Sequence, residues 1–206
     1  YNSLMYNITG GSNVAIGYES LRSSTGSQNV ALGYQSLYST TSGASNTAIG
    51  YQSLRNYTGH QSTALGYYSL QSNTTGSANT ASGYKTLAYT TTGSKNAGFG
   101  WMALNNNTTG SNNTAIGYDT GDVNTTGSNN TYLGYNADAN SNNLSNSTAI
   151  GYNATITASN QIKLGTSSET VSIPGNALIT GNLTVSGTTT TINTTNTTIS
   201  DNLIEL

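Results

Sequence analysis

One sequence pattern recurs along most of this 206-residue chain, with a period of 16 or 17 residues. A copy typically contains Val or Thr, a small residue, an aliphatic residue, Gly and an aromatic residue, as in Thr114-Ala115-Ile116-Gly117-Tyr118. We call the glycine of each copy its anchor glycine. The anchor glycines are Gly17, Gly33, Gly50, Gly66, Gly83, Gly100, Gly117, Gly134 and Gly151. Short β-branched and apolar segments at this fixed period predict a β-solenoid, with one turn, or rung, per repeat.

A second set of glycines lies seven residues before the anchor glycines. Its members are Gly10, Gly26, Gly43, Gly59, Gly76, Gly93, Gly110 and Gly127. Glycines at both corners permit backbone turns with positive φ. Tyr1 lies 17 residues before Tyr18 and predicts a further partial rung, and Gly165 predicts a shortened last rung. The expected fold is therefore all-β, a parallel β-roll of about nine to ten rungs over residues 1–165, roughly 40 Å long at ~4.8 Å per rung.

In such a stack, each residue lies on its counterparts in the rungs above and below. One such column is an asparagine ladder, whose amides can hydrogen-bond along the stack. It comprises Asn13, Asn29, Asn46, Asn79, Asn96, Asn113 and Asn130.

The large apolar side chains of a rung are the aliphatic residue before the anchor glycine, the aromatic residue after it and a leucine four residues after it. The leucines are Leu4, Leu21, Leu37, Leu54, Leu70, Leu87 and Leu104. We expect these three groups to form the core. Burying each contributes about 2 kcal/mol, against about 1–2 kcal/mol of backbone entropy per ordered residue. A single chain is therefore marginal, and we predict closed association into a homotrimer, with end-to-end fibre formation as a further option.

The composition excludes several classes of partner. Charged residues make up 6% of the chain and the net charge is −2, so no basic surface for nucleic acid is expected. No apolar run approaches the ~20 residues of a membrane span, so no membrane insertion is expected. The chain has no cysteine and therefore no thiolate metal site.

The repeat stops after Gly165, and residues 166–206 predict a different β segment. Apolar and polar residues alternate at Leu183-Thr184-Val185 and around Ile192 and Ile199. Such a polar segment cannot build a core alone. We expect its strands to intertwine with those of partner chains.

Two resemblances follow from these motifs. The Thr/Val-Ala-Ile-Gly-Tyr strand resembles the head repeats of trimeric autotransporter adhesins such as YadA, which form trimeric parallel β-rolls, although the repeat of that family is shorter. The TTGSNNTAIGY repeat followed by GNLTVSGTTTTINTTNTTISDNLIEL resembles bacteriophage and other viral tail-fibre proteins. Both resemblances imply a homotrimeric fibre in the virion or outside the cell, with a host-surface polysaccharide or protein as receptor. Neither implies catalytic residues.

The aromatic column is the first candidate binding site, because a flat ring can stack on a sugar. It comprises Tyr18, Tyr34, Tyr51, Tyr67, Tyr84, Trp101, Tyr118, Tyr135 and Tyr152. Packing between rungs or chains explains the same regular spacing and is the favoured interpretation.

Asn-x-Ser/Thr sequons are the second candidate, as glycosylation acceptors on exposed turns. They include Asn7, Asn56, Asn73, Asn107, Asn112 and Asn124. Richness in Asn, Ser and Thr produces such matches by chance, and a phage protein made in bacterial cytosol would carry no glycans.

The remaining candidates carry little chemistry. His60 stands alone, without an acid and a nucleophile in a recognisable order. Asp119 and Asp122 could contribute to a cation site, but a solvated turn explains them equally. Residues 93–100, GSKNAGFG, lack the Gly-Lys-Ser/Thr ending of a phosphate loop. We therefore predict no enzyme and no cofactor.

The expected function is a structural one, the shaft of a homotrimeric viral tail fibre involved in host attachment. The alternatives are a bacterial trimeric surface adhesin and a self-assembling extracellular filament. An ice-binding solenoid would need paired threonine columns, whereas this chain has a single column beside alanine. That column comprises Thr47, Thr63, Thr80, Thr114, Thr131 and Thr148.

Overall fold

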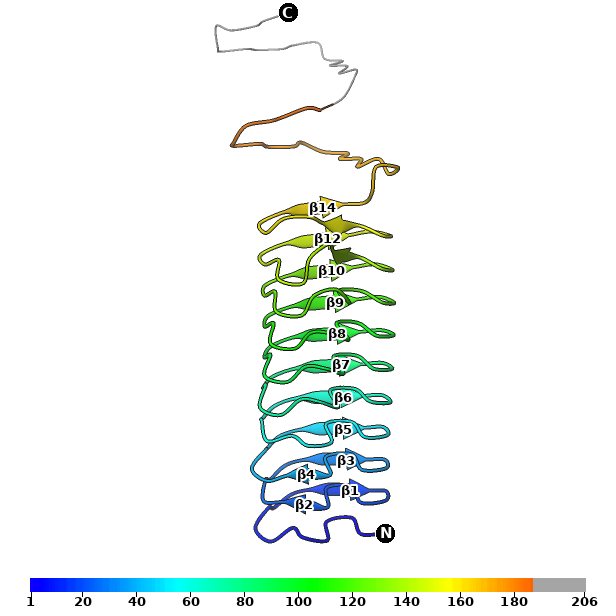
Figure 1. Ribbon diagram of the computed structural model, residues 1–206, viewed down its shortest axis with the longest axis vertical. Helices are drawn as coiled ribbons and strands as arrows, with labels where there is room; N and C mark the ends of the chain where they lie inside the picture. The colour runs from blue at the N-terminus through cyan, green and yellow to red at the C-terminus, as the bar shows by residue number, and fades with distance from the viewer. Residues whose placement is uncertain (187–206) are drawn as a thin grey trace, which may run out of the picture. The chain divides into compact units, whose positions relative to one another are not determined.

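The computed structural model describes residues 1–186, and this part of the chain is all-β without a helix (Figure 1). Ten short parallel strands form one sheet, in the order β1-β3-β5-β6-β7-β8-β9-β10-β12-β14. The strands are β1 (Val14–Ile16), β3 (Val30–Leu32), β5 (Thr47–Ile49), β6 (Thr63–Leu65), β7 (Thr80–Ser82), β8 (Ala97–Phe99), β9 (Thr114–Ile116), β10 (Thr131–Leu133), β12 (Thr148–Ile150) and β14 (Ile162–Leu164). Two further pairs are β2 (Ser23–Ser24) with β4 (Ser39–Thr40), and β11 (Asp138–Ala139) with β13 (Thr155–Ile156).

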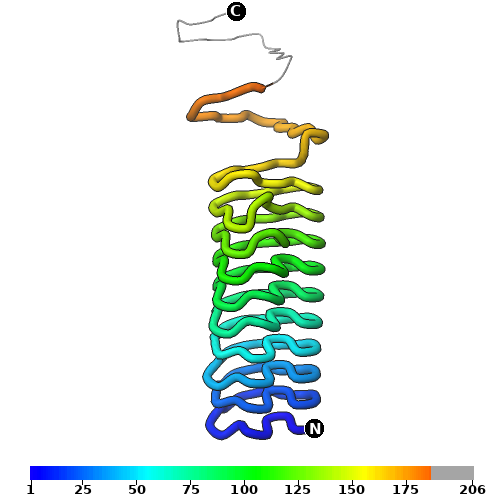
Figure 2. The backbone as a smooth tube through the Cα atoms, viewed as in Figure 1, coloured from blue at the N-terminus to red at the C-terminus, as the bar shows by residue number. Residues whose placement is uncertain are grey.

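The predicted β-solenoid is confirmed, with one rung for each repeat (Figure 2). Neighbouring strands pair in the register of the repeat, so that Ala48 lies opposite Ala64 and Ile49 opposite Leu65. Both expected end rungs are present. The ring of Tyr1 stacks on Tyr18, and β14, just before Gly165, is the last strand of the sheet.

The core of the solenoid is thinner than expected, because two of the three expected core groups lie outside it. In the strands between the two end rungs the middle residue is buried, and the residue before the anchor glycine faces outward in most of them, as in Ala48 at 0% exposed and Ile49 at 37%. The leucines from Leu21 to Leu104 are buried as expected and Leu4 is partly buried, but most aromatic residues after the anchor glycines are exposed. Successive side chains along a strand point to opposite faces of the sheet. The alanine column packs closely beside the leucine column, since a Cβ added at Gly98, in the alanine column, would lie 2.5 Å from Cγ2 of Thr86 and in contact with Cδ1 of Leu87 at 3.4 Å.

The buried leucines have a left-handed backbone. Their φ values lie between 47° and 54°, as in Leu54 at 47° and Leu87 at 54°. A non-glycine residue in this region costs about 1–2 kcal/mol. The stack stabilises the conformation, because each leucine N–H donates to a carbonyl of the next rung, as from Leu54 to Ser69 at 3.2 Å.

The two glycine sets serve different purposes. The anchor glycines have positive φ, from 116° at Gly151 to 145° at Gly117, as expected for a corner. The second set does not have positive φ, which corrects the expectation for those residues. They are required instead by close approach, because a Cβ at Gly26 or Gly76 would overlap the glycine carbonyl of the next rung.

The predicted asparagine ladder is confirmed and connects rungs through the backbone. Oδ1 of Asn96 accepts the N–H of Asn113 at 2.9 Å, and Nδ2 of Asn96 donates to the carbonyl of Gly110 at 2.9 Å. Ser62 interrupts the column, and the buried ring of Tyr57 compensates. Its hydroxyl contacts Ser62 Oγ at 2.7 Å and donates to the carbonyl of Gly76 at 2.9 Å.

The repeat forms one compact unit, Tyr1–Thr170, which extends slightly past the expected boundary at residue 165. The following segment is described only to residue 186, and residues 171–186 contain no strand. Residues 183–185 form no strand within the single chain, and their expected intertwining with partner chains stays a prediction. The expected strands around Ile192 and Ile199 lie outside the described residues.

Candidate functional site: an apolar face along the solenoid

The aromatic residues that follow the anchor glycines form a continuous stack. Successive ring centroids lie between 4.1 Å, for Tyr84 and Trp101, and 6.3 Å, for Trp101 and Tyr118. The ring planes are nearly parallel, with angles between 7° and 19°. The positive φ of each anchor glycine turns the chain just before the ring. In-register stacking of rungs then places each ring on the next.

An aliphatic column accompanies the aromatic one, because both residues that flank an anchor glycine face outward. The exposed members of the aliphatic column are Ile16, Leu32, Ile49, Leu65, Phe99, Ile116, Leu133, Ile150 and Leu164. We call these residues, together with the aromatic column from Tyr1 to Tyr152, the ladder face. At the central rungs its side chains are about 40% exposed, as in Leu65 at 37% and Tyr67 at 42%. Tyr84 is half-buried.

The side chains of the ladder face are uncharged, and the Nζ of the neighbouring Lys85 lies 5.4 Å from the ring centre of Tyr84. The neighbouring carboxylate of Glu19 raises the pKa of the Tyr18 phenol above its usual range, and burial adds to this effect. Tyr68 follows Tyr67 directly and adds a ring outside the column, which meets Tyr51 edge-on with the ring centroids 5.4 Å apart. A hydrogen bond with Tyr67 raises the pKa of the Tyr68 phenol. Both effects favour the neutral phenol.

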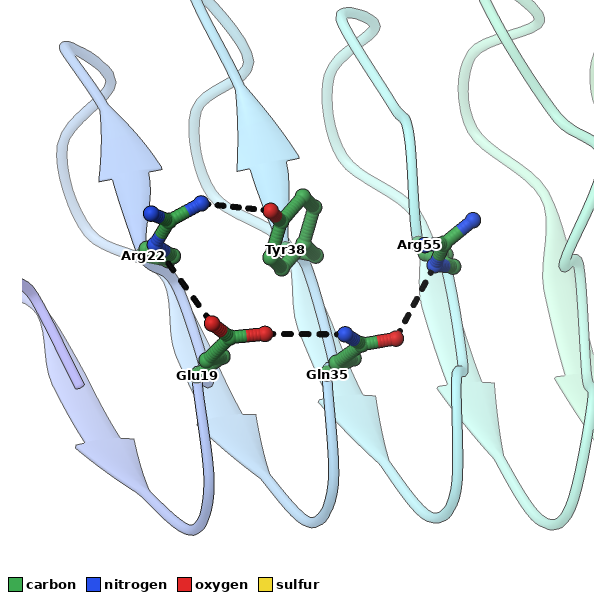
Figure 3. A network of polar contacts seen from close by, with 5 residues as sticks. All are labelled: Glu19, Arg22, Gln35, Tyr38 and Arg55. Carbon is green, nitrogen blue, oxygen red and sulfur yellow. Dashed lines mark hydrogen bonds and ion pairs between the residues drawn. The ribbon is translucent and has the colours of Figure 1, made fainter. Parts of the chain in front are cut away.

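A polar network near the N-terminal end satisfies several of the few charged side chains (Figure 3). Glu19 Oε2 accepts a hydrogen bond from Gln35 Nε2 at 2.9 Å, and Gln35 Oε1 accepts one from Arg55 Nε at 3.2 Å. Arg22 donates to the hydroxyl of Tyr38 and lies 3.7 Å from Glu19. The guanidinium groups of Arg22 and Arg55 lie 5.5 Å and 5.3 Å from the ring centre of Tyr38. The network links three rungs and pairs Glu19 with Arg22, whereas Arg55 contacts the neutral side chains of Gln35 and Tyr38.

Three of the six sequon asparagines are not on exposed turns, which corrects that expectation. Asn73, Asn107 and Asn124 are fully buried. Their Nδ2 atoms donate to the carbonyls of the glycines three residues later, at 2.8, 3.0 and 3.1 Å. Asn7 is half-buried and makes the same bond. These carboxamides are parts of the turn.

The remaining two sequon asparagines, Asn56 and Asn112, are exposed. Of the six asparagines named above, these two have the accessibility that a modified side chain requires.

The candidates for catalysis or metal binding lie apart from one another. His60 Nδ1 accepts the N–H of Ala44 at 3.1 Å, in a column where other rungs use serine. Within residues 1–186, no group of three or more His, Cys, Asp or Glu side chains could hold a metal ion. Asp122 instead accepts a hydrogen bond from Asn106 Nδ2 at 3.1 Å. Residues 93–100 form an ordinary rung around β8.

Along the described sheet strands, the threonine column from Thr47 to Thr148 has no second threonine column beside it. Each of these threonines begins a sheet strand and is half-buried, followed by a buried and then an exposed residue. The outward neighbour on the same face is therefore usually Ile or Leu.

The sequence shows that the leucine column ends at Leu104 and that Tyr132 departs from the repeat, but sequence reasoning assigned no role to the rungs that follow. After Leu104 the equivalent positions hold Gly121, Asp138 and Thr155, and Tyr132 replaces the small residue of the sheet strand. Burial raises the pKa of the Asp138 carboxyl to about 6, and backbone N–H groups of Ala139 and Val123 partly oppose this shift. The departure from the repeat was the available signal.

Comparison with protein-family models, with curated proteins and with solved structures returned no match. In the described part of the chain, no helix is long and apolar enough to cross a membrane.

Proposed function

We propose that this chain is the shaft of a homotrimeric β-fibre, in which the ladder faces of three copies pack together. The observation that carries the proposal is the size of the exposed apolar surface. Ten rings of about 200 Å² each, roughly half exposed, amount to about 1,000 Å². A soluble monomer seldom exposes a contiguous apolar patch above about 300–600 Å², whereas a stable interface buries about 800 Å² per partner.

Identical copies are the partners that fit this face best. The side chains of the face are uncharged, and the charged neighbours at its edge include Lys85, whose Nζ lies 5.4 Å from the ring centre of Tyr84, and Glu19 beside Tyr18. Its features recur at every rung, and copies related by an axis parallel to the stack place equivalent rungs at the same height. Three-fold closure is supported by the resemblance of the strand motif to trimeric adhesin heads.

The biological role that we propose is a viral tail-fibre shaft for host attachment. The tail-fibre-like repeat supports this role, and the stacked rungs with their inter-rung hydrogen bonds suit a stiff spacer. A bacterial trimeric surface adhesin or an extracellular filament is the second candidate, favoured by the combination of the Ala-Ile-Gly-Tyr strand with a parallel β-roll.

The test is the mass of the particle in solution, measured by sedimentation equilibrium at micromolar concentration. We expect three times the chain mass of 21.2 kDa. Ile116→Lys places a charge on the ladder face and should give monomers that retain β-type circular dichroism. Val123→Lys is the matched control, because Val123 is as exposed as Ile116, 43% against 44%, and lies off that face. A monomeric wild-type chain would overturn the proposal.

A further inference from the structure

A second surface of the solenoid is hollowed into an open groove of about 610 Å³. Its lining includes Tyr89, Asn106 and Val123, which occupy the same position in three successive rungs, six residues after the anchor glycine. Thr91, Thr108 and Thr125, two residues further along each rung, also line it. None of these residues belongs to the ladder face, so the groove does not compete with the proposed interface for side chains.

The groove follows from the alternation of side chains in this part of the rung. The residue between the two outward positions is buried, as are Asn107 and Asn124. The threonines that line the groove are held in place by hydrogen bonds between rungs. Thr91 Oγ1 donates to the carbonyl of Thr108 at 3.2 Å, and Thr108 Oγ1 donates to the carbonyl of Thr125 at 3.0 Å. Since each hydroxyl proton is already engaged, the threonine oxygens remain available as acceptors.

The groove combines an aromatic surface with polar groups. Tyr89 is 50% exposed and offers a ring face. Asn106 Nδ2 donates to Asp122 Oδ1 at 3.1 Å, so the amide and the carboxylate are held side by side. Asn105, only 4% exposed, donates to Asn106 Oδ1 at 3.2 Å, and its own Oδ1 has no hydrogen-bond partner.

We propose that this groove binds a linear, uncharged polysaccharide whose chain runs along the stack of rungs. The inference rests on the proposed attachment function and gives it a ligand class. A sugar ring has an apolar face that stacks on an aromatic ring, and neighbouring hydroxyls that pair with a carboxylate and an amide. The ~4.8 Å rise between rungs is close to the length of one sugar residue in an extended chain, so successive residues meet successive rungs.

The charge of the groove selects against acidic sugars. Asp122 is the charged residue of its lining. Burial, and then the neighbouring carboxylate of Asp119, raise the pKa of Asp122, so this site already disfavours negative charge. A uronic or sialic acid would add a further carboxylate to the same place.

The experiment is a calorimetric titration of the intact chain with cellohexaose, maltohexaose and chitohexaose as uncharged probes, and hexagalacturonate as an anionic one. We expect saturable binding of at least one uncharged probe and none of hexagalacturonate. Tyr89→Ala should weaken binding about tenfold, and Tyr89→Phe should preserve it. Asn106→Ala should also weaken it, whereas Asn56→Ala, at the same rung position outside the groove, should not. Asp122→Asn should admit hexagalacturonate.

Three results would overturn the inference. They are the absence of binding for all uncharged probes at millimolar concentration, equal binding by Tyr89→Ala and wild type, and loss of binding in Trp101→Ala, which would place the sugar on the ladder face. Sedimentation of the same samples separates this inference from the fibre proposal. A trimer that does not bind refutes only the groove, and a monomer that binds through Tyr89 refutes only the trimer.

Discussion

Tyr132 fills the space that the leucine column leaves at Gly121. A Cβ added at Gly121 would lie 2.8 Å from Cδ2 of Tyr132 and 3.0 Å from Cδ2 of Leu104. In the rungs from Leu21 to Leu104, a leucine occupies the position of Gly121 and a small residue that of Tyr132. The core of this rung is therefore filled by the ring of Tyr132, from the sheet strand, in place of a leucine side chain at position 121.

This exchange makes the two positions energetically coupled. Tyr132→Ala should lower the free energy of unfolding by about 3–5 kcal/mol, because it empties a buried site. Gly121→Leu alone should also destabilise, by overpacking. The double variant restores the arrangement of the other rungs, so its loss should be smaller than the sum of the two single losses. Urea denaturation of all four proteins measures the coupling, and additive losses would contradict it.

The anchor glycines should not tolerate a side chain. Gly66→Ala combines a φ of 137° with overlap between the new Cβ and the carbonyl of Gly83, and should cost at least about 2 kcal/mol. Gly11→Ala is the control, because no atom lies within 4 Å of its added Cβ. Denaturant midpoints should fall for the first variant and stay unchanged or rise slightly for the second. Equal midpoints would refute the close-approach argument.

The asparagine ladder should contribute to stability through its backbone contacts. Asn96→Ala leaves the N–H of Asn113 without its acceptor and removes one of the two amide donors to the carbonyl of Gly110, at a cost of about 1–3 kcal/mol. Asn56→Ala, at an exposed position, should change stability by less than about 0.5 kcal/mol. Amide hydrogen exchange at Asn113 should accelerate only in the first variant. Unchanged protection there would mean that the ladder is dispensable.

The stability of the fold should fall as pH rises between about 4 and 7. The pKa of Asp138 is raised from 3.8 to about 6 in the folded chain, so folding favours the protonated carboxyl. This contribution is complete below the unfolded pKa and is lost as pH approaches 6, a change of about 3 kcal/mol. The raised pKa of Asp122 acts in the same direction.

Asp138→Asn should flatten this dependence, as measured by the unfolding temperature across the pH range. Glu169→Gln serves as the control. Hydrogen bonds from Thr166 lower the pKa of Glu169, so its contribution to the free energy of unfolding rises with pH, opposite to that of Asp138. An unchanged slope in Asp138→Asn would show that this buried carboxyl is not the titrating group.

The sequence by itself determined the periodic part of the structure. The spacing of the anchor glycines specified the rung length, and the Val/Thr-Ala-Ile segments specified the sheet strands and their register. Identical residues at a fixed period can stack only on their counterparts. The aromatic column and the asparagine ladder therefore followed from counting residues, and so did the end rungs at Tyr1 and Gly165.

Only the tertiary structure decided which side of each rung faces inward. Alternation along a strand makes Ala48 and Ile49 face opposite ways, but it does not say which of them is inside. In the structure the alanine column lies inside and packs in one core with the leucine column, where a Cβ added at Gly98 already meets Thr86 and Leu87. The same reversal leaves Ile49 and Tyr51 exposed. The tertiary structure also shows that the sequon carboxamides of Asn73 and Asn107 are buried, because each donates a hydrogen bond to the carbonyl of the glycine three residues later in its turn.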